Sequence, residues 1–201
     1  ATRGPTNKVD RYLDALSREL ALRADALDAA FGGPGSDGRP ALETVYVGGG
    51  TPSIVPTDGI QRILSQARLR FGLADGAEVT REGNPGPGER GDPATLLRAG
   101  VTRISFGAQS LDDTELRRLG RRHRGRHVAD AVTGAREAGF TSINVDLLYD
   151  IPDSDLATWM TTIDRILDLG PDHLSLYALA LDDPDAEGLT GPSGDHLPVT
   201  K

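Results

Sequence analysis

The sequence contains no cysteine, and this absence is the first constraint on what the chain can do. It excludes disulfides, thiolate nucleophiles, and cysteine-ligated zinc or iron–sulfur sites within the chain. Aromatic residues make up only 4% of the 201 residues, so aliphatic side chains must build the core. The length is sufficient for one sizeable α/β domain.

Long apolar runs and an excess of positive charge are also missing. No apolar stretch approaches the ~20 residues that a membrane-spanning helix requires. The net charge is −8, which argues against general nucleic-acid binding because that needs a basic surface. The first residues, 1–5, lack the apolar segment of a signal peptide, so a cytoplasmic location is the expectation.

A run of three glycines, Gly48–Gly50, follows the short apolar segment 44–47 and precedes Thr51 and Pro52. This pattern indicates a buried strand that ends in a loop whose backbone comes close to another group. Glycine leaves no Cβ in the way, so bare N–H and C=O groups there suit an amine or a carboxylate. The run is not a phosphate-binding Walker A loop, because no Gly-Lys-Ser/Thr follows it. A tight strand-to-helix turn is the alternative interpretation.

Helical and strand patterns alternate along the chain. Helices are expected at 8–31 with Asn7 as N-cap, and at 57–71, 93–99, 111–119, 128–138 and 156–169. Strands are expected at 44–47, 78–81, 103–106, 142–149 and 173–179. Regular alternation predicts an α/β fold with five parallel strands, either an open doubly wound sheet or a partial (β/α) barrel. The polar remainder, rich in Pro, Gly and Asp, is expected to be a tail or linker.

Polar or glycine residues follow each predicted strand. They are Gly48–Thr51, Glu82 with Asn84, Gln109 with Ser110, Asp146, and the segment after Tyr177. In both candidate architectures the carboxyl ends of parallel strands meet at one edge, where ligands bind. The sequence therefore predicts a small-molecule site at that edge.

Six segments in register resemble one protein family over residues 8–182. They are VGGGTPS at 47–53, EGNP at 82–85, GVTRISFGAQS at 100–110, LGR at 119–121 with His123, NVDLLY at 144–149 with Pro152, and PDHLSLYAL at 171–179. These segments resemble the radical SAM proteins related to oxygen-independent coproporphyrinogen III oxidase, and most of all the HemW-type heme chaperones. The resemblance implies a partial (β/α) barrel at 1–182, without its first strand and cluster loop, and a polar tail or linker at 183–201.

The chain departs from this family at its cofactor loop. Family members carry a Cys-x3-Cys-x2-Cys loop that holds a [4Fe–4S] cluster, and none of these cysteines is present. Truncation, engineering and natural degeneration are all open as explanations. Two smaller departures are Gly83, where relatives often have Ala, and Asp150, where they usually have Gly.

The resemblance also implies a site for S-adenosyl-L-methionine (SAM). Its residues are Gly49, Gly50, Thr51, Glu82, Gln109, Arg121, Asp146 and Ala180. By resemblance, Glu82 binds the SAM ammonium, Arg121 the carboxylate, and Gln109 and Asp146 the ribose. The alternative to ligand binding is a structural role, in which Glu82 caps the loop that follows its strand. No catalytic or metal-binding residue is expected, and weak SAM binding is expected because the cluster that chelates SAM is missing.

Two function classes follow from the resemblance. One is heme binding and delivery by a chaperone, here reduced to a core without a cluster. The other is oxidative decarboxylation in porphyrin biosynthesis, and an inactive fragment is a third interpretation. The expected ligands are SAM, a tetrapyrrole and possible heme. The missing first strand would leave an unpaired edge on the strand at 44–47, which favours an oligomer.

Overall fold

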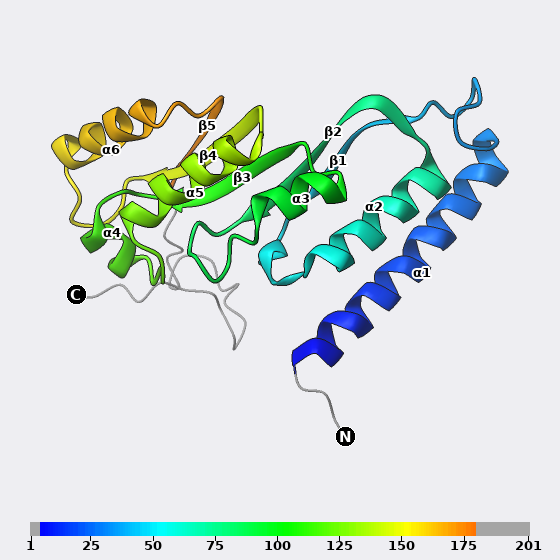
Figure 1. Cartoon of the computed structure of the whole chain (residues 1–201), viewed down its shortest axis with the longest axis horizontal. Helices are drawn as coiled ribbons and strands as arrows, with labels where there is room; N and C mark the ends of the chain where they lie inside the picture. Colours follow the sequence, from blue (N-terminus) through cyan, green and yellow to red (C-terminus); the bar gives the residue numbers. More distant parts are fainter. Residues whose placement is uncertain (1–4, 180–201) are drawn as a thin grey trace, which may run out of the picture.

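Alternating helices and strands build one parallel sheet in the computed structural model, which describes residues 5–179 (Figure 1). Its strand order is β1-β2-β3-β4-β5, and each neighbouring pair is parallel. A doubly wound sheet reverses its strand order part-way, whereas a barrel adds each strand beside the previous one. The sequential order therefore decides for the partial barrel, and the predicted fold class is confirmed.

The element bounds agree with most of the predicted ranges. The strands are β1 (Leu42–Val47), β2 (Leu73–Gly83), β3 (Arg103–Gln109), β4 (Ser142–Tyr149) and β5 (His173–Ala178). The helices are α1 (Pro5–Phe31), α2 (Thr57–Phe71), α3 (Pro93–Ala99), α4 (Asp113–Arg118), α5 (Gly125–Ala138) and α6 (Leu156–Asp168), with a short 3-10 turn η1 (Pro52–Ile54). The predicted tail at 183–201 lies outside the described residues.

Some predicted boundaries are wrong for local reasons. The helix α1 already begins at Pro5, so Asn7 lies inside it and is not its N-cap. The helix α4 begins at Asp113 because the Asp112 carboxylate accepts the N–H groups of Thr114 and Glu115, which ends the preceding loop. The strand β2 is much longer than the predicted segment 78–81.

The hydrophobic core lies on one face of the sheet. Alternate residues of the strands, such as Ile104 and Phe106 of β3, pack there against the helices, with Leu64 of α2 and Val128 of α5 among the fully buried side chains. The intervening strand residues, such as Ser105, point to the other face. This second face is polar, and it carries the predicted site residues of the strands.

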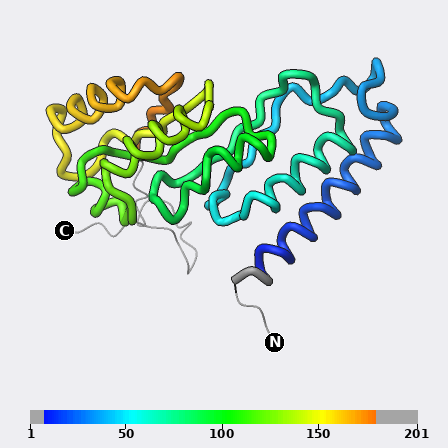
Figure 2. The backbone as a smooth tube through the Cα atoms, in the orientation of Figure 1, coloured from blue at the N-terminus to red at the C-terminus, as the bar shows by residue number. Residues whose placement is uncertain are grey.

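The helix α1 lies beside α2 at one end of the molecule, next to the sheet edge formed by β1 (Figures 1 and 2). Leu13 is buried there, and a β-carbon at Gly59 of α2 would lie only 2.8 Å from its Cδ1 atom. Asp14 of α1 pairs with Arg62 of α2 at 2.8 Å. Within the described residues β1 pairs with β2 alone, so its outer edge has no neighbouring strand. No helix in residues 5–179 has the length and apolar character needed to cross a membrane.

Candidate ligand site at the carboxyl edge of the sheet

Glu82 is anchored by the glycine loop after β1. Gly49 donates its backbone N–H to Oε2 of Glu82 at 3.1 Å, and the Tyr46 hydroxyl donates to Oε1 at 2.8 Å. A β-carbon at Gly48 would lie 2.5 Å from Cε1 of Tyr46 and 2.8 Å from Oε1 of Glu82. Only glycine fits at this position. The loop-capping role considered for Glu82 is thus present in the structure, and the half-buried carboxylate keeps further lone pairs for a ligand.

The glycine loop itself needs left-handed backbone. Gly49 has φ of 83° and Gly50 has φ of 49°, a region that residues with a side chain rarely adopt. Both glycines and Thr51 are exposed, and they line the end of a groove described below. The sequence prediction of a loop with accessible backbone groups agrees with this geometry.

Asp146 is held by a polar network across three strands. The Ser105 hydroxyl of β3 donates to its Oδ2 atom at 3.0 Å, and the Asn144 amide donates to its Oδ1 atom at 2.6 Å. The same amide contacts Oγ of Ser105 at 2.8 Å and Oγ of Ser175 of β5 at 3.0 Å. Asn144 and Ser105 are buried, whereas Asp146 is half-buried. The network therefore fixes a carboxylate that solvent and ligands can still reach.

Gln109 is placed by an irregularity at the end of β3. Pairing with β4 shifts register between Gly107 and Gln109, and Gln109 has φ of 67° although it is not glycine. Such bulges redirect side chains at functional sites. The Nε2 atom of Gln109 lies 3.0 Å from the position that a β-carbon of Gly107 would take, and Oδ1 of Asn84 lies 3.9 Å from it. Gln109 and Asn84 therefore converge next to Asp146, which pairs with Gly107 in the sheet.

Arg121 follows α4 and is half-buried. Burial lowers the pKa of its guanidinium, and the nearby Glu89 carboxylate opposes that shift. Next to it, Nε2 of His123 lies 2.9 Å from the carbonyl oxygen of Ala108, and burial lowers the pKa of His123. His123 is thus a buried structural residue that fixes the loop of Arg121 to β3.

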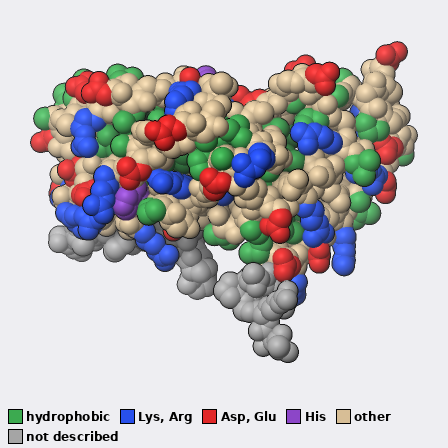
Figure 3. Space-filling view, in the orientation of Figure 1, with side chains coloured by type: hydrophobic (Ala, Val, Ile, Leu, Met, Phe, Trp, Pro, Cys, Tyr) green, Lys and Arg blue, Asp and Glu red, His purple; other side chains and the backbone are tan. Residues whose placement is uncertain are grey.

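The arginine-rich stretch around Arg121 behaves mainly as a solvated surface. Its other arginines are all exposed: Arg117, Arg118, Arg122, Arg124 and Arg126. Figure 3 shows basic side chains gathered at the end of the molecule where α4 lies. Only Arg121 therefore combines partial burial with a position near the strand ends.

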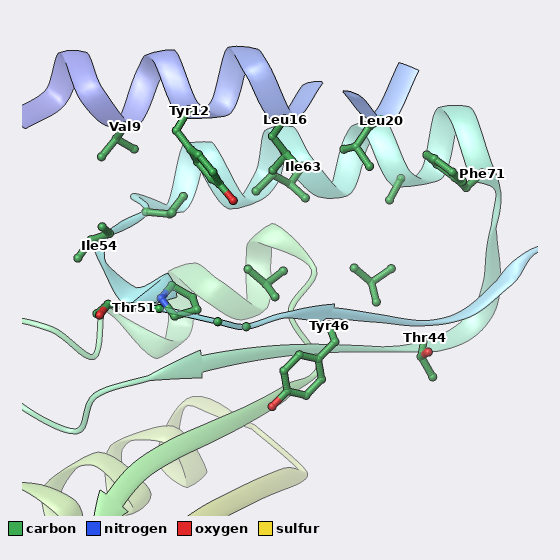
Figure 4. Close-up of a pocket in the computed structure, with 18 of the residues that line it drawn as sticks. Val9, Tyr12, Leu16, Leu20, Thr44, Tyr46, Thr51, Ile54, Ile63 and Phe71 are labelled. Carbon is green, nitrogen blue, oxygen red and sulfur yellow. The ribbon is translucent and has the colours of Figure 1, made fainter. Parts of the chain in front are cut away.

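Tyr46 belongs to the same site, although the sequence analysis did not select it. Tyr46 is 59% exposed, and its side chain points away from α1 toward the polar face of the sheet (Figure 4). Burial of the hydroxyl and the hydrogen bond to Glu82 raise the pKa of Tyr46 to about 12. The negative charges of the Glu82 and Asp146 carboxylates both raise the pKa of the Tyr46 hydroxyl further.

An apolar groove of about 960 Å³ adjoins the site on the side of α1. Its walls come from α1, α2 and β1, and Figure 4 shows the apolar side chains of α1 above the β1 strand. The α1 residues are Val9, Tyr12, Leu16, Leu20 and Leu27, together with Lys8. The groove runs along the unpaired edge of β1 and ends at the glycine loop.

The predicted site residues are partly brought together. Gly49 contacts Glu82 directly, and the carboxylates of Glu82 and Asp146 lie on the same polar face. No hydrogen bond among the described residues connects Arg121 to these groups. Ala180 lies outside the described residues. The residues that sequence reasoning missed are Tyr46, Ser105, Asn144 and Ser175, and their signal was the two-residue alternation of polar side chains along β1, β3, β4 and β5.

Comparison with known proteins identifies the family. The family model of the radical SAM superfamily matches residues 35–166. The chain belongs to the radical SAM superfamily. It is 39% identical over 173 residues to the heme chaperone HemW of Mycobacterium tuberculosis, covering 86% of this chain and 42% of that protein. It is 38% identical over 141 residues to HemW of Escherichia coli, covering 70% of this chain and 37% of that protein.

The fold agrees with this radical SAM assignment. The radical SAM enzyme coproporphyrinogen III oxidase of Escherichia coli superposes with a TM-score of 0.76 at 31% identity, covering 92% of this chain and 40% of that one. The chain therefore lies in the HemW-like branch, as the sequence motifs predicted. It spans about two fifths of the length of these relatives.

The two cofactors of radical SAM proteins fit this chain differently. The family uses SAM together with a [4Fe–4S] cluster, and such clusters are held by cysteine thiolates. This chain has no cysteine, so its own residues do not fit the cluster. SAM fits better, because a Cβ-free glycine loop and two anchored carboxylates meet at the carboxyl edge of the sheet.

Proposed function

We propose that the carboxyl edge of the sheet binds SAM or a close adenosyl analogue. The observation that carries this proposal is the pair of anchored carboxylates, Glu82 beside Gly49 and Asp146 beside Asn144. Hydrogen-bond acceptors whose positions are already fixed suit the ammonium and the ribose hydroxyls of SAM. Gly50 and Thr51 extend the loop, and Gln109 stands next to Asp146.

Arg121 completes the proposed site. Its planar guanidinium can bind the SAM carboxylate through two parallel hydrogen bonds. Its partial burial and its lack of a carboxylate within 4.0 Å among the described residues leave it available for such a ligand. Ala180 is the proposed backbone contact to the adenine. The protein would supply binding and positioning, and the redox chemistry of the family would come from the cofactors.

Calorimetry with S-adenosylhomocysteine tests the site without needing a cluster. Asp146→Ala and Arg121→Ala each remove a charged contact, and each should weaken binding by about 10- to 100-fold. Asp164→Ala is the matched control, because Asp164 is exposed on α6 and forms no ion pair in the described part of the chain. Equal binding by the unmodified chain and all three variants would contradict the assignment of the site.

We further propose that the complete function is heme binding and delivery, as in the HemW chaperones. The support is the identity of 38–39% to two proteins named heme chaperone, against 31% to the coproporphyrinogen III oxidase. Oxidative decarboxylation of a porphyrinogen is the alternative, and an inactive core is the third. Titration with heme and, separately, with coproporphyrinogen, followed by absorbance, discriminates among them. Stoichiometric heme binding supports the chaperone, and binding of the porphyrinogen alone supports the oxidase. If the chain binds neither ligand, the inactive core is supported.

The unpaired edge of β1 suggests a binding partner for this chain, namely a second copy of itself. An exposed parallel edge presents N–H and C=O groups to any other strand. The apolar groove beside this edge adds a surface that water solvates poorly. We therefore infer self-association of this chain through β1, which light scattering tests as described in the Discussion.

A further inference from the structure

A cavity of about 350 Å³ lies where β4 leaves the sheet and the chain continues to α6, at the end of the molecule that also carries α4 (Figure 1). Its volume falls within the range of roughly 300–1,000 Å³ that is usual for small-molecule sites. None of its lining residues belongs to the proposed SAM site. Tyr149, which lines the cavity, follows Asp146 by three positions, so the two side chains point to opposite faces of the sheet. The cavity is therefore separate from the SAM site.

Glu115 of α4 brings a buried carboxylate to this cavity. It is 5% exposed, and it lines the cavity together with Ser154. The Ser154 hydroxyl donates to its Oε1 atom and the Ser110 hydroxyl donates to its Oε2 atom, which leaves further lone pairs on both oxygens. Glu115 forms no ion pair with a basic residue in the range 5–179. Two neutral hydroxyls do not fully compensate a negative charge removed from water, so this carboxylate favours a cation beside it.

The other charged groups at the cavity are negative as well. Asp150 and Asp155 line it, and no basic residue is among its lining residues. The guanidinium of Arg118, one helical turn after Glu115, lies 3.7 Å from the carboxylate of Asp153 and pairs with that residue instead. The three carboxylates around the cavity therefore attract a positively charged ligand.

The walls of the cavity favour an organic cation over a metal ion. Within residues 5–179, no three acidic, histidine or cysteine side chains are grouped so that they could hold a metal. The walls also include the apolar side chains of Ile151 and Leu156 and the rings of Tyr149 and Trp159. The two ring centroids lie 5.9 Å apart, with an interplanar angle of 54°. Apolar walls suit an aliphatic stem, and the face of a tryptophan ring attracts an ammonium group.

We propose that this cavity binds a short-chain primary alkylammonium ion. The ammonium group donates to the Glu115 carboxylate beside Ser154, and the aliphatic stem packs against Trp159. Asp150, which is exposed, adds a negative charge that attracts the ligand. A free amine and the side chain of a lysine share this chemistry, and the two sources are separated by the choice of probe.

Trp159 is the only tryptophan of the chain, so its fluorescence reports directly on this cavity. Titration with n-pentylammonium at constant ionic strength should give a saturable change in emission. The alcohol 1-pentanol has the same stem without the charge, and it should bind at least about 10-fold more weakly. Glu115→Gln keeps the shape of the side chain and removes its charge, so it should weaken pentylammonium binding about 10- to 100-fold. Glu137→Gln, at an exposed position of α5, is the matched control and should bind like the unmodified chain.

A second variant serves if Glu115→Gln does not fold. Asp150→Asn removes an exposed charge, and asparagine tolerates the φ of 60° at this position, so the variant should fold and weaken binding about 2- to 5-fold. Nα-acetyl-lysine methylamide separates the two sources of the ligand. If it binds as well as pentylammonium, a lysine side chain is the ligand. If it is excluded while pentylammonium binds, the ligand is a free amine.

The opposite outcomes overturn the proposal. An emission that pentylammonium leaves unchanged, or equal affinities for pentylammonium and 1-pentanol, would mean that the cavity does not recognise the cation. Unchanged affinity in a folded Glu115→Gln would mean that the buried carboxylate does not bind the ammonium group. If only Asp150→Asn folds, unchanged affinity in that variant would contradict the role of the carboxylates around the cavity.

Discussion

Gly49 and Glu82, 33 positions apart in the sequence, meet where the backbone N–H of the glycine donates to the glutamate carboxylate at 3.1 Å. This contact joins the loop after β1 to the end of β2. It brings the exposed backbone of the loop next to a carboxylate, and the first two predictions test this arrangement.

Gly48→Ala should destabilise the fold and weaken adenosyl-ligand binding. The new methyl group would lie within 3 Å of both Tyr46 and Glu82, so the two side chains must move apart. Overpacking of this kind costs about 1–3 kcal/mol, measured by urea unfolding. Gly134→Ala is the control, because no atom lies within 4 Å of its β-carbon position on α5, and it should stabilise the protein by about 0.5–1 kcal/mol. Unchanged stability of Gly48→Ala would refute the packing argument.

Tyr46 should make stability depend on pH in the alkaline range. Its pKa is raised to about 12, so the folded state keeps the phenol protonated better than the unfolded chain does. The stabilising effect is therefore complete below about pH 10, the ordinary tyrosine pKa, and is lost as the pH rises through about 12. The difference in unfolding free energy between the unmodified chain and Tyr46→Phe should shrink over this range. Tyr12→Phe, on exposed α1, should show no such trend.

The chain should bind no iron–sulfur cluster. Thiolates are the required ligands, and the sequence contains none. Anaerobic reconstitution with iron and sulfide should give no stoichiometric absorbance in the visible cluster band. A cysteine-containing radical SAM protein treated in parallel serves as the positive control. A stable [4Fe–4S] spectrum in this chain would disprove the prediction.

The unpaired edge of β1 should cause self-association or marginal stability. Light scattering should detect oligomers. If the chain is monomeric instead, its melting temperature should lie at or below the usual mesophile range of about 45–65 °C. Thr44→Lys adds a charge on this exposed edge strand, and it should raise the monomer fraction. Gln61→Lys, on the exposed side of α2, is the matched control and should have no effect. A clean monomer with a higher melting temperature would mean that the edge is protected.

Local sequence patterns were sufficient to predict which segments form helices and which form strands. Alternation of apolar and polar residues marked β4, and helical spacing marked α2, both with the predicted bounds. The carboxylate of Asp92 caps α3 by accepting the N–H of Thr95, a local interaction because an N-cap acts on N–H groups only three positions ahead. The choice between a doubly wound sheet and a barrel was not decided by local patterns, since strand order depends on contacts between distant segments.

The site was predictable only where a residue carries its own signal. Glycines and carboxylates at strand ends are conspicuous in the sequence, so Gly49, Glu82 and Asp146 were found. Tyr46 and Asn144 were missed, because a tyrosine or an asparagine in a strand is ordinary until its partner on the neighbouring strand is known.

The tertiary structure alone decided the burial of Arg81. In the sequence it is one of many arginines, and its position in β2 predicts either face equally well. Arg81 is buried on the helix-covered face, where its Nη1 atom donates to the carbonyl oxygen of Arg90, and this follows from the packing of β2 against the 83–92 segment. Hydrogen bonding and desolvation depend on distances between atoms far apart in the chain, and those distances exist only after folding.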